Sequence, residues 1–263
     1  MSDAQDSLAI NRAGWNQVAP RFYGGTALPT YGPLAPTEST LGLLGSVSGA
    51  RVLELGCGSG HSLRYLAERD AAEVWGLDLS STQIAFASDV LQAFTPRVHL
   101  FESPMEVNPG LPVDYFDMVI SIYGLGWTTD LPTTLSLVSQ YLKPGGHFIF
   151  SGEHPAFGCL RYANEQFVFA EPYATEGPTA LDSWSGVKIV LQRRTLSTFV
   201  NEVVRAGLHV DALIEGELDT SLATAAHADP ARWYSIARAR LMPTTFILKA
   251  RKPTTSGHTP NAS

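Results

Sequence analysis

Short apolar runs alternate with amphipathic stretches along the middle of this 263-residue chain. The apolar runs predict five strands, at residues 51–55, 73–79, 97–102, 116–122 and 146–152. Between them, apolar residues recur at helical spacing at residues 61–69, 82–91 and 131–141. Ser80 or Ser81 stands where a residue that caps the second of these helices is expected. Strands that alternate with helices are typical of an α/β fold, in which a doubly wound, mostly parallel sheet carries helices on both faces.

The pattern changes after the fifth predicted strand. Residues 155–185 mix proline, glycine and aromatic side chains without sustained periodicity, which predicts an irregular segment that forms or covers a ligand pocket. A contact between two copies of the chain is the alternative use of this segment. Further on, Thr195 caps a predicted helix that Gly207 ends, and "LHVDALIEG" and "TTFILKAR" predict two closing strands around a short helix. These two strands complete a seven-stranded sheet with an antiparallel C-terminal hairpin.

We expect three parts along the chain. Residues 1–45 form an N-terminal helical cap, and residues 46–252 form the main α/β domain, with an insertion at about residues 153–190. Residues 253–263 are rich in threonine, serine and proline and are expected to be a disordered tail.

Composition narrows the possible partners and locations. The formal net charge is -7, from 18 basic and 25 acidic side chains, and no basic cluster interrupts it, so we expect no nucleic-acid partner. The two cysteines, Cys57 and Cys159, fit neither a disulfide framework nor a metal site, which favours a reducing cytoplasm and no bound metal. The N-terminus does not resemble a signal peptide, and no apolar run is long enough for a membrane span. A cytoplasmic monomer or homodimer without a membrane partner is therefore expected.

The stretch "VLELGCGSGHSL" carries the chemical signal. Gly56, Gly58 and Gly60 follow a predicted buried strand and precede a predicted helix, so they permit a tight turn and let a ligand approach the backbone. Asp78 ends the next predicted strand. This arrangement predicts a loop that binds a nucleotide-type cofactor. The third glycine stands one place earlier than in the GxGxxG pattern of dinucleotide-binding proteins.

The motif E-x-G-x-G-x-G, from Glu54 to Gly60, resembles the first motif of class I S-adenosylmethionine-dependent methyltransferases. The resemblance continues in order through "GLDLS", "YFDMVIS" and "LKPGGHFIFS", and thus covers about residues 51–152. It implies a Rossmann-like fold and S-adenosylmethionine as the cofactor. More loosely, "WNQVAPRFYGG" and "QRRTLSTFVNEVVRAGL" resemble the ubiquinone-biosynthesis-like subgroup, also called methyltransferase type 11, which acts on small molecules.

The resemblance also implies which residues bind the cofactor. Asp78 takes the place of the acid that holds both ribose hydroxyls, and the chain departs from the family at Pro104, where an acid usually meets the adenine amino group. Met105 then offers packing and a backbone amide to adenine, with Glu102, Ser103 or Glu106 as polar substitutes. The expected cofactor-binding residues are Glu54, Gly56, Cys57, Gly58, Gly60, Asp78, Leu79, Gln83, Met105, Ser121, Tyr23 and Trp15.

The reaction that the resemblance implies is in-line transfer of a methyl group to an oxygen, carbon or nitrogen atom of a small-molecule acceptor, which releases S-adenosylhomocysteine. The expected catalytic residues are His154 as leading candidate for the base, Glu153 and Tyr123, since all three end strands where such sheets bind ligands. Trp127, Phe157 and Tyr162 are expected to line a pocket for an aromatic or apolar metabolite. Two alternatives are an NAD(P)-dependent oxidoreductase and a protein that binds S-adenosylmethionine without transferring its methyl group.

Overall fold

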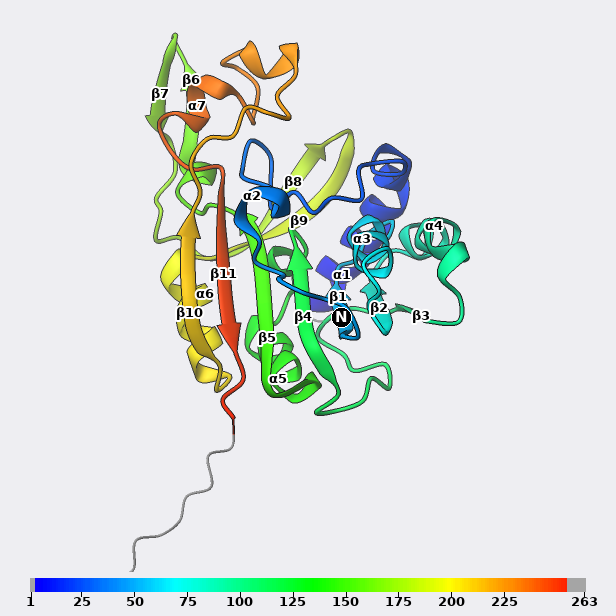
Figure 1. The fold of residues 1–263 in the computed structure, drawn as a ribbon. Helices are drawn as coiled ribbons and strands as arrows, with labels where there is room; N and C mark the ends of the chain where they lie inside the picture. The colour runs from blue at the N-terminus through cyan, green and yellow to red at the C-terminus, as the bar shows by residue number, and fades with distance from the viewer. Residues whose placement is uncertain (1–2, 255–263) are drawn as a thin grey trace, which may run out of the picture.

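A seven-stranded sheet forms the centre of the computed structural model, which describes residues 3–254 (Figure 1). The predicted tail at residues 253–263 therefore lies mostly outside the described residues. The strand order is β10-β11-β5-β4-β1-β2-β3, and β11 alone runs antiparallel to both of its neighbours. The strands are β1 (Arg51–Leu55), β2 (Glu73–Asp78), β3 (Val98–Glu102), β4 (Phe116–Ile122), β5 (Leu142–Glu153), β10 (His209–Glu215) and β11 (Thr245–Arg251). The predicted α/β class, the mostly parallel sheet and its antiparallel C-terminal hairpin are confirmed.

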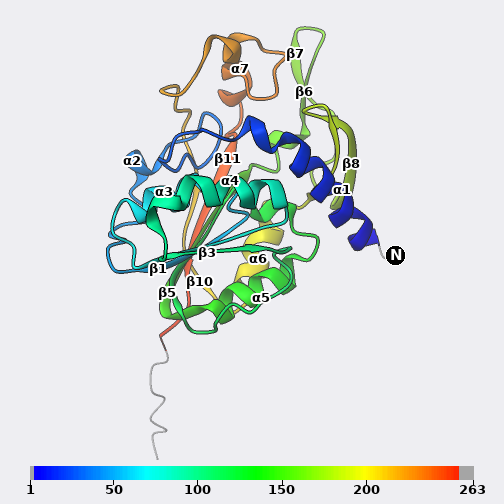
Figure 2. The same cartoon turned by 90° about the vertical axis from the view of Figure 1, so that its right-hand side faces the viewer.

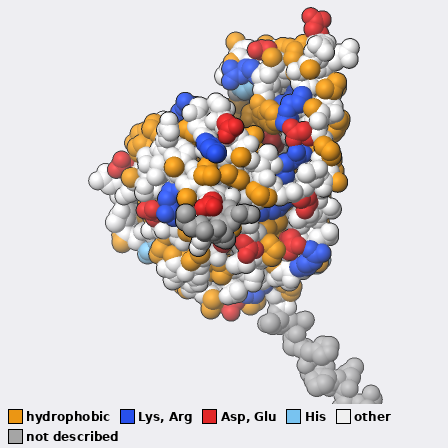
Figure 3. All heavy atoms as spheres, turned by 180° about the vertical axis from the view of Figure 1, so that it is seen from behind, with side chains coloured by type: hydrophobic (Ala, Val, Ile, Leu, Met, Phe, Trp, Pro, Cys, Tyr) orange, Lys and Arg blue, Asp and Glu red, His pale blue; other side chains and the backbone are white. Residues whose placement is uncertain are grey.

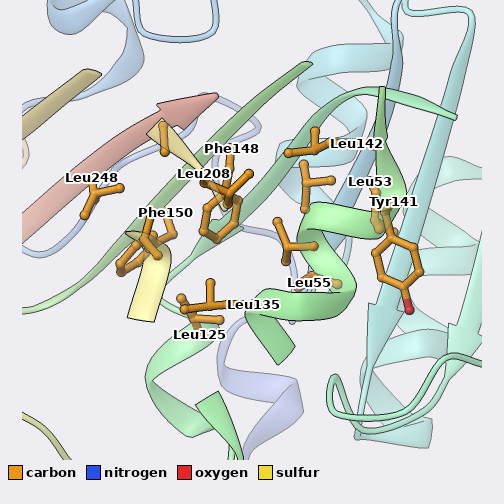
Figure 4. Packing of buried hydrophobic residues seen from close by; sticks show 14 of the residues in the cluster. Leu53, Leu55, Leu125, Leu135, Tyr141, Leu142, Phe148, Phe150, Leu208 and Leu248 are labelled. Atoms are coloured by element: carbon orange, nitrogen blue, oxygen red, sulfur yellow. The ribbon is translucent and has the colours of Figure 1, made fainter. Parts of the chain in front are cut away.

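Helices cover both faces of the sheet (Figure 2). α3 (His61–Ala67), α4 (Ser81–Leu91) and the short η2 (Gln92–Phe94) lie on one face, and α5 (Leu131–Tyr141) and α6 (Leu196–Arg205) lie on the other. Each face has its own apolar core, and Figure 4 shows the core under α5, where Phe148 and Phe150 of β5 pack among leucines. Burial of each such side chain stabilises the fold by about 1.5–3 kcal/mol.

Polar side chains cap the first turns of α4 and α6 at positions where the sequence predicts helix caps. The Ser80 hydroxyl accepts a hydrogen bond from the backbone N–H of Gln83 at the start of α4, and Thr195 caps α6 in the same way through Thr198. The sequence predicts that the fifth strand begins at Gly146, but β5 begins at Leu142. Its first residues pair with β4 across a register shift, so this segment is an irregular strand start.

The N-terminal segment lies over the carboxyl ends of the parallel strands. It contains α1 (Asp3–Val18), η1 (Ala19–Arg21) and α2 (Glu38–Leu41), and Figure 2 shows α1 beside β8. Glu38 anchors this segment: its buried carboxylate accepts hydrogen bonds from the Tyr31 hydroxyl and from the backbone N–H groups of Leu43 and Leu44. The predicted N-terminal cap thus has helices at both of its ends, with irregular chain between them.

The segment after β5 is more regular than its sequence predicts. It forms η4 (Phe157–Cys159) and two antiparallel hairpins, one of β6 (Leu160–Ala163) and β7 (Gln166–Phe169), the other of β8 (Gly177–Trp184) and β9 (Val187–Arg193). The prediction of an irregular segment over residues 155–185 was wrong. Within β6, β7 and β8 only Leu160 is buried, so an alternating apolar pattern is weak in the sequence.

A lobe stands beyond the carboxyl ends of the parallel strands (Figures 1 and 3). It combines the β6–β7 hairpin with the segment between β10 and β11, which contains η5 (Ala225–Ala228) and α7 (Ile236–Ala239). On the face in Figure 3, acidic and basic side chains of the lobe are interspersed. Within residues 3–254, no helix has both the length and the apolar character needed to cross a bilayer.

Candidate functional site

The loop after β1 makes the floor of the site. Gly56, Gly58 and Gly60 all have positive φ angles, of 69°, 51° and 76°, which favour glycine. A Cβ atom on Gly56 would lie 3.0 Å from the Cα atom of Gly124, so the loops after β1 and β4 touch there. A Cβ atom on Gly60 would instead meet Ala87 and Leu91 of α4 at 3.1 Å. The first two glycines thus face a cavity, whereas the third allows α3 and α4 to pack closely.

A cavity of about 300 Å³ opens above this loop. This volume is at the lower end of the range for a site that holds one small ligand. The sequence-predicted residues that line it are Trp15, Glu54, Gly56, Cys57, Gly58, Asp78, Leu79, Gln83, Met105, Tyr123 and Trp127. Residues from five separate parts of the sequence therefore meet near the carboxyl ends of β1, β2, β3 and β4, where open α/β sheets bind ligands.

Two carboxylates, the buried Glu54 and the partly buried Asp78, give the cavity its electrostatic character. The Asp78 carboxylate accepts hydrogen bonds from the backbone N–H groups of Gly58 (2.9 Å) and Ser80 (2.8 Å), yet burial still raises its pKa. Glu54 is only 2% exposed, and its Oε2 atom has no hydrogen-bond partner. Burial, helped by the nearby Asp78 charge, raises the pKa of Glu54 well above its usual range. A cationic ligand would relieve this cost.

Two tryptophans line the cavity, and a third packs against both of them. Trp15 of α1 lies 5.1 Å from Trp127 of η3 (Leu125–Trp127) and 5.2 Å from Trp184 of β8, measured between ring centroids. We call Trp15, Trp127 and Trp184 the tryptophan cluster. Trp184 packs against the other two, so the β8–β9 hairpin supports the tryptophans that line the cavity. That the segment at residues 155–185 forms or covers a ligand pocket stays a prediction.

Helix α1 is held over the cavity by two asparagines. The Asn11 side chain forms two hydrogen bonds with the backbone of Val190 in β9, at 2.7 and 2.9 Å. Asn16 accepts a hydrogen bond from the Ser80 hydroxyl at 2.6 Å and another from the Thr82 N–H at 3.3 Å. These bonds connect α1 to the second hairpin on one side and to the start of α4 on the other.

Comparisons with known proteins agree with this geometry. A family model described as a methyltransferase domain matches residues 52–146. An S-adenosylmethionine-dependent methyltransferase from Mesorhizobium loti is 29% identical, has a TM-score of 0.67, and the match covers 81% of this chain and 96% of that one. The chain belongs to the class I S-adenosylmethionine-dependent methyltransferases. S-adenosylmethionine is its cofactor, and the nicotinamide alternative is set aside.

Two curated relatives of this methyltransferase show how far sequence similarity extends. An uncharacterized protein from Haemophilus influenzae is 29% identical over 224 residues, which is 81% of this chain and 85% of that protein. The ubiquinone biosynthesis O-methyltransferase from Alkalilimnicola ehrlichii is 33% identical over 110 residues. That match covers only 41% of this chain and 43% of the relative.

The residues present fit this cofactor. The glycine turn leaves the cavity floor without side chains, and the unpaired Oε2 atom of Glu54 lines the cavity close to Asp78. A molecule that carries ribose hydroxyls, which can donate hydrogen bonds, and a positive charge matches these two carboxylates. Burial raises the pKa of the Cys57 thiol well above its usual range, so Cys57 stays protonated and contributes packing rather than a nucleophile.

The region expected to meet adenine also lines the cavity. Ser103, Pro104, Met105 and Glu106 follow β3 there, whereas Glu102 is exposed and does not line it. Oε1 of Glu106 accepts hydrogen bonds from the Thr128 hydroxyl (2.7 Å) and from the N–H of Thr129. Glu106 therefore joins the loops after β3 and β4.

Three predicted cofactor residues lie outside the cavity of the methyltransferase. The buried Ser121 hydroxyl donates to the backbone oxygen of Leu55, and Gly60 packs against α4. The Tyr23 ring is 47% exposed and stacks on Phe86. Each of these residues thus has a structural contact elsewhere, and none of them lines the cavity.

His154 also lies away from the cavity. Its buried Nε2 atom donates to Glu215 at 2.7 Å, and its Nδ1 atom accepts from the N–H of Ala156 at 3.2 Å. One neutral tautomer satisfies both bonds, so the ring links the ends of β5 and β10. The predicted base role of His154 therefore has no support from the cavity geometry.

The structure separates the expected substrate-pocket residues. Trp127 lines the cavity, but Phe157 is fully buried against Tyr234 and Arg238 in the lobe. Tyr162 packs on Phe167 across the β6–β7 hairpin. Only the first of these three predictions is thus placed at the cavity.

Sequence reasoning missed several residues that line the cavity. Leu8, Asn11 and Phe22 come from the N-terminal segment, and His61 starts α3. Leu8, Asn11 and Trp15 recur at helical spacing, so one face of α1 carried a signal that could have identified them. The His61 Nε2 atom lies 3.2 Å from the N–H of Gly25 and so helps to hold the chain after α1.

Proposed function

We propose that this methyltransferase moves a methyl group to an oxygen, carbon or nitrogen nucleophile of a small acceptor with an apolar or aromatic face. The observation that carries the proposal is that one cavity joins the carboxylates of Glu54 and Asp78 to Trp15 and Trp127. Among the described residues that line it, none is a lysine or an arginine, so an anionic acceptor would lack a counter-charge there. Aromatic rings suit a neutral or cationic acceptor with a flat or apolar surface.

The carboxylates are proposed to hold the cofactor. Asp78 has both oxygens fixed by backbone N–H groups, which leaves further lone pairs for ribose hydroxyls. Glu54 offers its unpaired oxygen to the amino group of the methionine part. Met105 supplies an apolar surface beside adenine, with Ser103 and Glu106 as its polar neighbours.

The remaining walls are proposed to position the acceptor. When bound, S-adenosylmethionine supplies a sulfonium methyl group, and the protein gains rate chiefly by holding the nucleophile in line at contact distance. Tyr123 and Gly124 after β4 line the same cavity as the two carboxylates and Trp127, which supports a role for them beside that reaction. The tryptophan cluster and Phe22 exclude water from the same space.

The proposal is tested by release of S-adenosylhomocysteine from purified protein given S-adenosylmethionine and a panel of phenols, catechols, amines and their carboxylated analogues. We expect turnover with neutral or cationic aromatic members and none with the matched carboxylates. The variant Trp127→Ala should raise the KM for the acceptor at least about tenfold, because a lost aromatic contact costs on the order of 1 kcal/mol beyond its buried area. Trp75→Ala serves as the control, since Trp75 packs on β2 and β3 and does not line the cavity. Turnover that favours the carboxylates contradicts the acceptor class, and binding without any turnover contradicts methyl transfer.

A further inference from the structure

A second acidic centre lies at the carboxyl end of β5, just beyond the cavity. The Oε2 atom of Glu153 accepts hydrogen bonds from the indole N–H of Trp233 (2.6 Å) and from the hydroxyl of Tyr234 (2.7 Å). Both donors come from the segment between β10 and β11 that forms part of the lobe. The lobe therefore brings two hydrogen-bond donors to a carboxylate that sequence alone places at a strand end.

Tyr123 connects this centre to the cavity. Its hydroxyl lies 2.8 Å from the hydroxyl of Thr245 and 3.4 Å from the backbone oxygen of Thr244, and it is close enough to the Tyr234 hydroxyl for each to shift the pKa of the other. Tyr123 itself lines the cavity. Each phenol has one proton to donate, and Tyr234 donates its proton to Glu153. A proton that moves between the two phenols can therefore pass only from Tyr123 to Tyr234, which is the direction from the cavity to the carboxylate.

The backbone holds Tyr123 in an unusual conformation. Its φ angle is +56°, which a non-glycine residue adopts rarely, and its N–H donates to the backbone oxygen of Ser151. A Cβ atom on Gly32 would lie 2.5 Å from Cε2 of Tyr123, so the N-terminal segment closes against the ring. Strain of this kind persists where surrounding contacts fix it, and it clusters at functional sites.

We propose that Tyr123, Tyr234 and Glu153, which we call the relay, together take up the proton that a hydroxyl or amine acceptor loses on methylation. This inference rests on the proposed function. The acceptor's lone pair forms the bond to the methyl carbon, and the pair of the broken carbon–sulfur bond stays on sulfur. The acceptor proton passes to the Tyr123 oxygen, the Tyr123 proton to Tyr234 and the Tyr234 proton to Glu153. The carboxylate ends as a neutral acid, and both tyrosines end as they began.

The charges around the relay suit this direction. Burial raises the pKa of both tyrosines, so each stays neutral and passes a proton on rather than holding a negative charge. Burial also raises the pKa of Glu153, against the opposing effects of its two donors and of Arg238 and Arg161. A carboxylate with a raised pKa is a stronger base than an ordinary one and is closer to the range that favours proton transfer at neutral pH.

The variants Tyr234→Phe and Glu153→Gln test the relay. Tyr234→Phe keeps the ring that stacks on Phe157 and removes only the hydroxyl, and Glu153→Gln keeps the size of the side chain and removes its basicity. Tyr234 and Glu153 act through Tyr123 and are positioning residues, so a pH profile is needed as well as a rate. We expect kcat to fall about 100-fold in both variants, because general bases contribute about 10²–10⁴-fold. We expect kcat of the wild type to fall at low pH, because Glu153 becomes protonated there. This fall should be absent in Glu153→Gln.

A matched control lies at the other end of the sheet. Glu73 accepts hydrogen bonds from the Trp75 indole (2.8 Å) and the Tyr115 hydroxyl (2.9 Å), which repeats the tryptophan–tyrosine–glutamate arrangement remote from the cavity. Here the two donors and Arg51 outweigh the effect of burial, and the pKa of Glu73 is lowered. Tyr115→Phe and Glu73→Gln therefore remove equivalent hydrogen bonds and should leave kcat and its pH profile unchanged.

The measurements are kcat for the best wild-type acceptor in the panel above and the Kd for S-adenosylhomocysteine, with a melting temperature for each variant. Reduced kcat with an unchanged Kd in the two relay variants supports the proposal. Wild-type kcat in folded Tyr234→Phe or Glu153→Gln overturns the relay and leaves the proposed function standing. If the wild-type protein releases no S-adenosylhomocysteine with any acceptor, the proposed function fails first and the relay fails with it.

Discussion

The Oδ1 atom of Asn16 accepts a 2.6 Å hydrogen bond from the Ser80 hydroxyl, which ties α1 to the start of α4 two residues after Asp78. The N–H of the same serine donates to Asp78 at 2.8 Å. One residue thus contacts both the proposed ribose-binding carboxylate and the helix that carries Trp15. The position of α1 over the cavity and the geometry of the cofactor site are therefore physically linked.

The variant Asn16→Ala should weaken binding of S-adenosylhomocysteine by up to about tenfold, because it removes hydrogen bonds worth about 1 kcal/mol each that hold α1 over the cavity. Calorimetric titration measures the change. The exposed neighbour Gln17 provides the control, and Gln17→Ala should bind as the wild type does. Equal affinities for the two variants would show that the link between α1 and α4 makes no contribution to cofactor binding.

The variant Asp78→Ala should lose at least about tenfold in affinity for S-adenosylhomocysteine, since each charge-assisted hydrogen bond contributes about 1.5–3 kcal/mol. Asp78→Asn should bind between the wild type and the alanine variant, because the amide keeps one acceptor oxygen. Asp89→Ala, an exposed acid on α4, controls for the change in net charge. Unchanged affinity in a folded Asp78→Ala protein removes Asp78 from the cofactor site.

The parts of the molecule that the sequence predicts well are those with local signals. The runs at 51–55 and 116–122 and the helix at 131–141 match β1, β4 and α5 residue for residue, because buried parallel strands and amphipathic helices carry strong apolar patterns. The glycine loop and Asp78 are also placed as expected, since the turn itself requires glycine and the acid ends a strand.

The parts that the sequence does not predict depend on contacts between distant residues. Glu153 and Tyr234 are 81 positions apart, and no local pattern shows that the lobe brings them together. For His154 the sequence suggests a role that the cavity geometry does not support. Its position at a strand end suggests a catalytic base, but its ring is hydrogen-bonded to Glu215, 61 positions later. The strands β6, β7 and β8 lack the buried apolar stripe from which strands are inferred.

The buried carboxylate of Glu54 should lower the stability of the protein when no cofactor is bound. Folding raises the pKa of Glu54, so the folded state holds that proton more tightly than the unfolded state does. The stabilising contribution is complete below the unfolded pKa of about 4.3 and is lost as the pH rises through the raised folded value. At pH 8, Glu54→Gln removes a buried charge whose Oε2 atom has no partner. Its melting temperature should therefore exceed that of the wild type.

The size of the effect and its control follow from the surroundings of the carboxylate. A gain of 1 kcal/mol corresponds to about 2–4 °C in a domain of this size class, and the gain should shrink at low pH, where Glu54 is neutral. Glu38→Gln is the control, because that buried carboxylate has three hydrogen-bond donors and its loss should lower the melting temperature. In the same Glu54→Gln protein, affinity for S-adenosylhomocysteine should fall. A variant that is less stable at pH 8, or that binds the ligand as tightly as the wild type, would contradict the view that Glu54 is kept unpaired for the cofactor.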